Sequence, residues 1–156
     1  MALFYSVAFA RDAPDLRQLV NQVATEWDTT LEVLNQQDKE ELVLQDGNLL
    51  LALSASNAAA YYELSFGEYP YKKRWHVTLG KEDTVAASFF LLQLVGKVAL
   101  EFTVDFLVLF NGELVLLKKE AGKLYLNTAT NMWENPLKKA IFQGIDQEAV
   151  CYPVNF

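Results

Sequence analysis

The sequence contains a single cysteine, Cys151, and a single histidine, His76, among its 156 residues. One cysteine cannot form an intrachain disulfide, and it excludes a cysteine-based metal cluster. With only one histidine, the chain also lacks the histidine pair at helical spacing that marks many zinc sites. We therefore expect no disulfide, no metal and no cofactor, which fits a reducing compartment.

The motifs of the common enzyme classes are missing too. The glycine spacing matches neither a phosphate-binding loop nor a dinucleotide fingerprint, and neither a nucleophile elbow nor a calcium loop can be traced. His76 could act as a general base, but it would need an orienting carboxylate and a nucleophile. We predict a non-enzymatic protein with no catalytic residues, and keep a small enzyme that uses His76 as the lesser alternative.

Targeting and membrane signals are also lacking. The apolar start, Met1–Ala10, has no basic leader and no small-residue cleavage pattern, so it predicts a strand and not a signal peptide. The longest uncharged apolar run, Thr84–Gly96, is too short to span a bilayer. We expect a soluble cytoplasmic protein with no membrane contact, folded as one domain over residues 1–156.

Basic residues are outnumbered, and the acidic excess is unevenly distributed. The net charge of −7 argues against nucleic acid as the main partner. From Glu26 to Asp46, seven acidic residues face Lys39 alone, which gives seven minus one, or a net charge of −6 in 21 residues. The simplest explanation is a solvated surface; the sharper one is a field that steers a basic protein partner. The candidate partner-binding residues are Glu32, Asp38, Glu40, Glu41 and Asp46.

Residues 103–127 carry the clearest structural pattern in the chain. Asn111-Gly112 lies between two apolar runs, and this pair accepts the positive φ angles of a type I′ hairpin turn. Gly122 supplies the permissive backbone for a second turn. The pattern predicts a three-stranded meander with strands Thr103–Phe110, Glu113–Lys119 and Lys123–Leu126. Because the first two strands are apolar on both faces, each side of the sheet must be covered.

Two long segments have the character of helices. Apolar residues recur at helical spacing from Leu16 to Trp27, and Asp12 is the expected N-cap. The second helix, Val85–Leu100, follows an N-cap at Asp83 or Thr84 and is apolar almost all round. We expect the sheet to cover one side of it, and another segment or subunit to cover the other.

Shorter signals complete the predicted fold. Asp46-Gly47 marks a hairpin, Gln36–Glu40 is a polar loop, and Asn135 caps a short helix that begins at Pro136. A loop at Gly67–Arg74 ends in the basic run Lys72–Arg74, which is either a soluble loop or an anion contact. Val150–Phe156 is an extended tail. The predicted class is α+β, an antiparallel sheet of about six or seven strands with a C-terminal β-meander and two main helices packed on it.

Several pieces of the chain resemble one protein family. They are Met1–Ser6, Asp12–Asp15, His76–Leu100, Asp105–Lys119 and Gly122–Asn127 followed by Trp133. This pattern is similar to that of the immunity proteins that protect myxobacteria and their relatives from swarming-inhibitor polymorphic toxins. The likeness is discontinuous, covers most of the chain and consists of strand-and-turn patterns. It brings no catalytic residues, and it implies a small cytoplasmic bacterial protein that binds and neutralises a cognate toxin.

Three functions thus stand open from the sequence. The first is an immunity-type toxin inhibitor, with the acidic segment steering it toward a basic toxin domain. The second is an interaction or scaffold module that self-associates, for example as a homodimer, through the apolar Val85–Leu100 helix. The third is an enzyme that uses His76.

Overall fold

The computed structural model describes residues 3–36, 39–47, 49–80 and 84–153. Helices and strands alternate irregularly along them, as expected for an α+β protein. In chain order they are β1 (Leu3–Phe9), α1 (Leu16–Glu26), β2 (Leu31–Gln36), β3 (Lys39–Asp46), β4 (Leu49–Ser56), β5 (Ala60–Leu64), β6 (Gly67–Tyr71), β7 (Lys73–Leu79), α2 (Thr84–Glu101), β8 (Phe106–Phe110), β9 (Leu114–Glu120), β10 (Lys123–Asn127), the 3₁₀ helix η1 (Asn131–Glu134), α3 (Pro136–Ala140) and β11 (Gln147–Val150).

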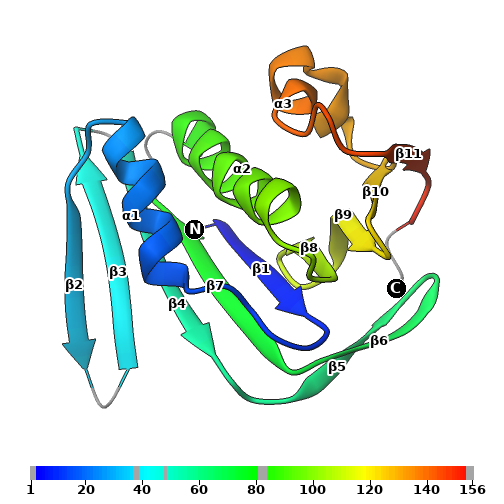
Figure 1. The fold of residues 1–156 in the computed structure, drawn as a ribbon, viewed down its shortest axis with the longest axis horizontal. Helices are drawn as coiled ribbons and strands as arrows, with labels where there is room; N and C mark the ends of the chain where they lie inside the picture. Colours follow the sequence, from blue (N-terminus) through cyan, green and yellow to red (C-terminus); the bar gives the residue numbers. More distant parts are fainter. Residues whose placement is uncertain (1–2, 37–38, 48, 81–83, 154–156) are drawn as a thin grey trace.

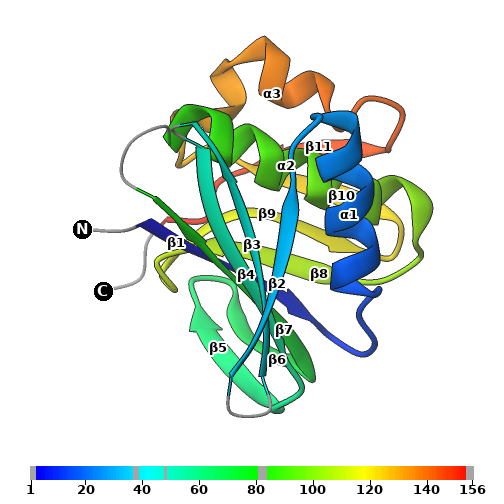
Figure 2. The ribbon, with the colours of Figure 1, turned by 90° about the vertical axis from the view of Figure 1, so that its left-hand side faces the viewer.

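Nine of these strands form one twisted sheet in the order β11-β10-β9-β8-β1-β7-β4-β3-β2, and β5 and β6 form a separate hairpin (Figure 1). Neighbouring strands of the large sheet are antiparallel, apart from the parallel pair β10 and β11. The two helices α1 and α2 lie on one side of this sheet, which we call the inner face (Figure 2). The β5–β6 hairpin lies against the opposite side, the outer face.

The predicted C-terminal meander is confirmed as β8, β9 and β10. Asn111 and Gly112 join the first two strands with φ angles of 52° and 73°, as a type I′ turn requires. Ala121 and Gly122 join the next two with φ angles of 51° and 80°. Ala121 lacks the freedom of glycine, and its N–H donates a hydrogen bond to the carboxylate of Asp105 at 3.0 Å, which helps to hold this conformation.

The inner face carries the main core. Phe9, Trp75 and Phe106 lie on the adjacent strands β1, β7 and β8 and are almost fully buried. Their rings meet at tilted or edge-on angles, with centroids 4.7 Å apart for Phe9 and Trp75 and 6.1 Å apart for Phe9 and Phe106. Such arrangements add to the stability that burial provides.

The apolar helix α2 is covered by the chain itself. On the α1 side, Trp27 packs edge-on against Phe90 with ring centroids 5.3 Å apart. On the α3 side, Gly96 allows such close approach that a Cβ placed on it would lie 2.7 Å from a side-chain carbon of Ile141. The sequence prediction that a further segment covers this helix is therefore confirmed. The large apolar side chains of α2 that remain exposed in the described chain are Val85 and Leu100, one at each end.

By length and composition alone, α2 could also cross a membrane, since its 18 residues are apolar enough. The prediction that this segment is too short rests on a run that stops at Gly96, whereas the helix continues to Glu101. Lys97, the charge that ends the run, forms an ion pair of 2.8 Å with Glu26 of α1. Because 56% of the helix is buried inside the fold, it has the character of a core helix.

The outer face has a smaller core of its own under the β5–β6 hairpin. Leu64 and Tyr71 of the hairpin pack on Leu107 and Leu109 of β8 and on neighbouring residues. Beside them, the Lys118 ammonium lies 4.6–5.6 Å from the ring centroids of three residues that come from the hairpin tip, β10 and the C-terminal segment: Phe66, Tyr125 and Tyr152. These cation–π contacts bring the hairpin tip, the sheet and the C-terminal segment together.

We expect Tyr69→Phe to stabilise the protein. The Tyr69 hydroxyl is buried beneath the hairpin without a hydrogen-bond partner among the described residues, and burial raises its pKa, as do Asp105 and Glu120. Removing an unsatisfied buried hydroxyl should raise the free energy of unfolding by about 1 kcal/mol. The control Tyr62→Phe should lower it, because the Tyr62 hydroxyl accepts a hydrogen bond from Arg74 at 2.9 Å. Urea unfolding of both variants tests this, and equal shifts in one direction would contradict it.

Four sequence predictions about local structure are wrong. The sheet has nine strands, not six or seven. In addition, both predicted loops contain strand residues, although β6 belongs to the separate β5–β6 hairpin. In the first loop, Gln36–Glu40, β3 begins at Lys39. The second, Gly67–Arg74, contains β6 and the start of β7. The N-cap of α1 is Asp15, which accepts a hydrogen bond from the Gln18 N–H at 3.2 Å, whereas Asp12 pairs with Lys73.

The remaining predictions about helix caps and the C-terminal region are confirmed only in part. Asn135 caps α3 as predicted and accepts hydrogen bonds from two backbone N–H groups, with Pro136 at the first helical position. Val150, the first residue of the predicted tail, is the last residue of β11, which pairs in parallel with β10, and residues 154–156 lie outside the described residues. The N-cap predicted at Asp83 or Thr84 falls at the start of α2, where residues 81–83 lie outside the described residues.

Candidate functional site

The acidic segment begins at the end of α1, and most of it belongs to the β2–β3 hairpin at one end of the large sheet (Figure 1). Four of the five predicted partner-binding residues lie on its strands, and all four are exposed: Glu32, Glu40, Glu41 and Asp46. The fifth, Asp38, lies outside the described residues. The structure therefore brings the four described acids together on the strands of one hairpin, including Glu40, which the sequence predicts in a loop.

Some of these carboxylates lie on the outer face of the hairpin and others on its inner face. Leu31 and Val33 line a groove with α1, so the alternation along β2 directs Glu32 to the outer face. Glu41 pairs with Leu34 of β2 and lies diagonally to Glu32 on that same face. Glu40 projects to the inner side, where it meets α1. Negative charge therefore borders the hairpin on both sides.

Little of this charge is neutralised within the chain. Glu40 forms an ion pair of 3.6 Å with Arg17 of α1, but the two side chains are 42% and 58% exposed. A pair so open to solvent contributes less than about 1 kcal/mol. In the part of the chain that the structure describes, Glu32, Glu41 and Asp46 have no ion pair. Their field is thus available to an external partner.

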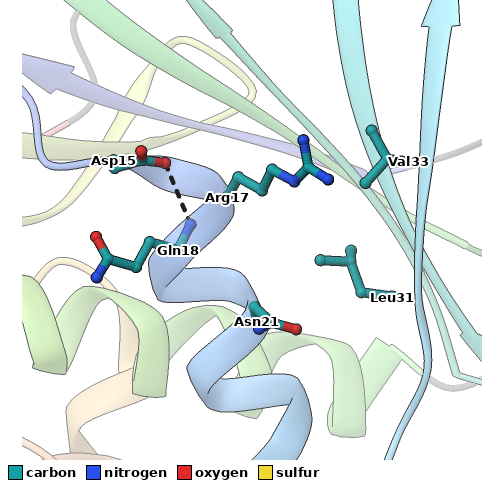
Figure 3. Close-up of a pocket in the computed structure, with 6 residues that line it drawn as sticks. All are labelled: Asp15, Arg17, Gln18, Asn21, Leu31 and Val33. Atoms are coloured by element: carbon teal, nitrogen blue, oxygen red, sulfur yellow. Dashed lines mark hydrogen bonds between the residues drawn. The ribbon is translucent and has the colours of Figure 1, made fainter.

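A groove runs between α1 and β2 (Figure 3). Its volume is about 420 Å³. Arg17 and Asn21 of α1 form its polar wall, with Arg17 extending toward the strand, and the half-buried Leu31 and Val33 of β2 form its apolar side. Asp15 and Gln18 also line it, so the groove is open and more polar than apolar.

β2 is the terminal strand of the sheet, with β3 on one side and no strand on the other within the described chain. In an antiparallel ladder, alternate residues of an edge strand direct their N–H and C=O groups away from the sheet. These groups can pair with another strand unless the edge is protected. The groove and the charged hairpin therefore adjoin an open sheet edge.

His76 lies on the outer face of β7 in a different environment. Its Nε2 accepts a hydrogen bond from Arg74 Nε at 3.2 Å, which requires a neutral ring. Its cross-strand neighbours are Ser6 of β1 and Ser54 of β4, but neither hydroxyl bonds to the ring in the described structure. The group that orients His76 is a cation and not the carboxylate that a general base needs, so this geometry gives the enzyme hypothesis no support.

The pKa of His76 leads to a pH prediction. Burial lowers it, and the positive charges of Arg74 and Lys39 lower it further. The unfolded chain therefore takes up a proton at a higher pH than the folded chain does, and stability falls as the pH drops through the unfolded-state value toward the folded one. We expect the stability advantage of the wild type over His76→Gln to shrink between pH 7.5 and pH 5. Urea unfolding of both proteins over this range measures it; a constant difference would contradict the prediction.

The three side chains of the basic run Lys72–Arg74 do not have the same surroundings in the structure. Lys72 is exposed, Lys73 forms an ion pair of 3.3 Å with Asp12, and Arg74 turns to the outer face toward His76 and Tyr62. The anion contact that the run suggested would need these charges to converge. Arg74 points away from the other two, whereas Lys72 and Lys73 line one hollow together with Arg11 and Asp12.

Comparisons with other proteins add no family assignment. No protein-family model matches the chain, and a comparison with curated proteins found no match. No group of three or more metal-binding side chains occurs among the described residues.

The groove and the open edge are not predicted by the sequence. A signal for the strand was present, because Leu31 and Val33 alternate with Glu32 as in a half-buried strand. Leu31, Val33 and Leu34 are compatible with either a short strand or a turn of helix, so the sequence does not decide between them. That Arg17 and Asn21 face this strand from α1 depends on helix packing, which no local pattern encodes.

Proposed function

We propose that this chain is a non-enzymatic binding protein that neutralises a basic protein partner, in the manner of the immunity proteins it resembles. The proposal rests on one observation, the exposed and largely unpaired acidic side chains of the β2–β3 hairpin. A partner toxin that acts on nucleic acid would carry a basic surface complementary to this hairpin. Binding there would inhibit the partner by covering that surface.

The alternative, a self-associating scaffold module, depends on an uncovered apolar face of α2. Self-association was expected through the apolar face of α2, and α1, the sheet and the segment after α3 now cover that helix. Its exposed ends, Val85 and Leu100, stand apart from each other by most of the helix length. A binding protein that uses its charged hairpin agrees better with this surface.

The test is survival of cells that produce a candidate toxin. The gene for this chain is cloned together with the gene directly upstream, and the upstream product is induced with and without the chain. We expect growth to be restored only when the chain is present, and the two proteins to co-purify. No protection, despite soluble production of both proteins, would overturn the proposal.

A further inference from the structure

We propose that β2 is a docking edge at which an extended basic segment of the partner protein adds a further strand to the sheet. This inference deepens the proposed function and rests on it. It assigns the contact to the open edge of β2 and to the groove between α1 and β2, and it assigns the partner's chemistry to an extended strand with lysine or arginine at alternate positions.

The edge itself has the right form for strand addition. β2 has a strand partner on one side only in the described sheet, and its six residues offer about 20 Å of backbone for pairing. Peptides that add to such an edge gain affinity from main-chain hydrogen bonds and specificity from pockets for alternate side chains. β2 offers both, because a groove follows its inner side.

The groove would receive the inner-facing side chains of the added strand. A strand hydrogen-bonded to β2 lies about 4.8 Å from it, so its side chains on that face come next to Leu31 and Val33. The volume of about 420 Å³ leaves space for them below the wall formed by Arg17 and Asn21. Apolar side chains would cover the half-buried Leu31 and Val33.

The negative charge beside β2 determines which kind of strand can pair with it. Glu32 and Glu41 lie on the outer face beside the edge, so the outward side chains of an added strand meet negative charge. A second copy of β2 would bring like charges together, which disfavours pairing between two copies. A strand with lysine or arginine at its outward positions would be attracted instead. The favoured occupant is thus a basic strand of a different protein.

The experiment uses the full chain and labelled synthetic octapeptides that alternate lysine with valine, isoleucine, leucine or phenylalanine. A matched panel carries glutamate in place of lysine. We expect at least one lysine peptide to bind at least ten-fold more tightly than its glutamate counterpart in fluorescence anisotropy. In amide NMR spectra, the peptide should shift residues of β2 and protect them from hydrogen exchange. N-methylation of alternate peptide amides, which retains the charge, should weaken binding at least ten-fold.

Two pairs of variants distinguish peptide binding at the β2 edge from nonspecific attraction of the basic peptide to an acidic protein. Asn21 is an exposed residue of α1 that lines the groove, so Asn21→Trp should fill the groove and weaken peptide binding at least five-fold. Gln22 is also exposed but does not line the groove, so Gln22→Trp should leave peptide binding unchanged. Glu32→Lys with Glu41→Lys should weaken it similarly, whereas Glu113→Lys with Glu134→Lys should not. If no lysine peptide binds, or the shifts lie away from β2, the docking edge is wrong even where the toxin assay shows protection. Peptide binding without protection would overturn the proposed function and leave the docking edge in place.

Discussion

Replacing Phe9 by alanine should lower the free energy of unfolding by about 3–5 kcal/mol, the usual cost of removing a buried phenylalanine ring. Phe9 is fully buried in the middle of the sheet, and its ring contacts both Trp75 and Phe106. The rigid strands around it cannot collapse into the space that the ring leaves. Because many domains have a total stability of only about 5–15 kcal/mol, the variant should be close to unfolding at 37 °C.

Phe4→Ala supplies the matched control. Phe4 lies on the same strand, but its side chain is 46% exposed on the outer face. Its removal should cost less than about 1 kcal/mol, as for most surface substitutions. Urea unfolding followed by tryptophan fluorescence measures both variants. Similar losses for the two would mean that the inner face of β1 is not the centre of the core.

The second large effect concerns the acidic hairpin. Changing Glu32, Glu41 and Asp46 to lysine moves the net charge from −7 to −1, since each of the three changes adds two charges. If the hairpin steers a basic partner, the association rate at low ionic strength should fall by roughly ten-fold or more, with a smaller change in the dissociation rate. Glu40 is left in place because it pairs with Arg17. The fold should survive, because all three positions are exposed.

A second triple variant separates position from total charge. Glu68, Glu113 and Glu134 are also exposed and lie on other elements, and their change to lysine gives the same net charge. At 0.1 M salt this variant should keep most of the wild-type association rate, because screening there limits the reach of distant charges to about 10 Å. Stopped-flow association with the purified partner across a salt series compares the three proteins. Equal rates, independent of salt, would show that the acidic cluster is only a solvated surface.

Much of the local structure followed from the sequence. Asn111-Gly112 determined a hairpin turn, because few residue pairs accept two positive φ angles in succession. Asn135-Pro136 determined the start of α3 through a side-chain cap and a fixed backbone angle. The apolar stripe from Leu16 predicted α1, although its cap is Asp15. In each case the deciding interactions connect residues only a few positions apart.

The large sheet was harder to predict because its strands pair across long separations. β1 pairs with both β7 and β8, and β11 joins β10 in parallel, an arrangement that no short pattern encodes. β6 was mistaken for a loop because tyrosine, proline and glycine occur together in it. Its hairpin is a strand pair because it packs on the outer face of β8, which supplies the apolar surface that it needs.

For the candidate site, too, some features follow from the sequence and others only from the tertiary structure. The sequence by itself determined the acidic segment, since its charge is a matter of composition, and it determined that the apolar α2 had to be covered. Only the tertiary structure decided that the acids lie on strands at an open sheet edge, that Arg17 neutralises one of them, and that a groove separates α1 from β2. The physical reason is that an edge or a groove depends on how whole elements are placed against one another. That placement is set by the packing of the whole core and not by the residues that line the groove.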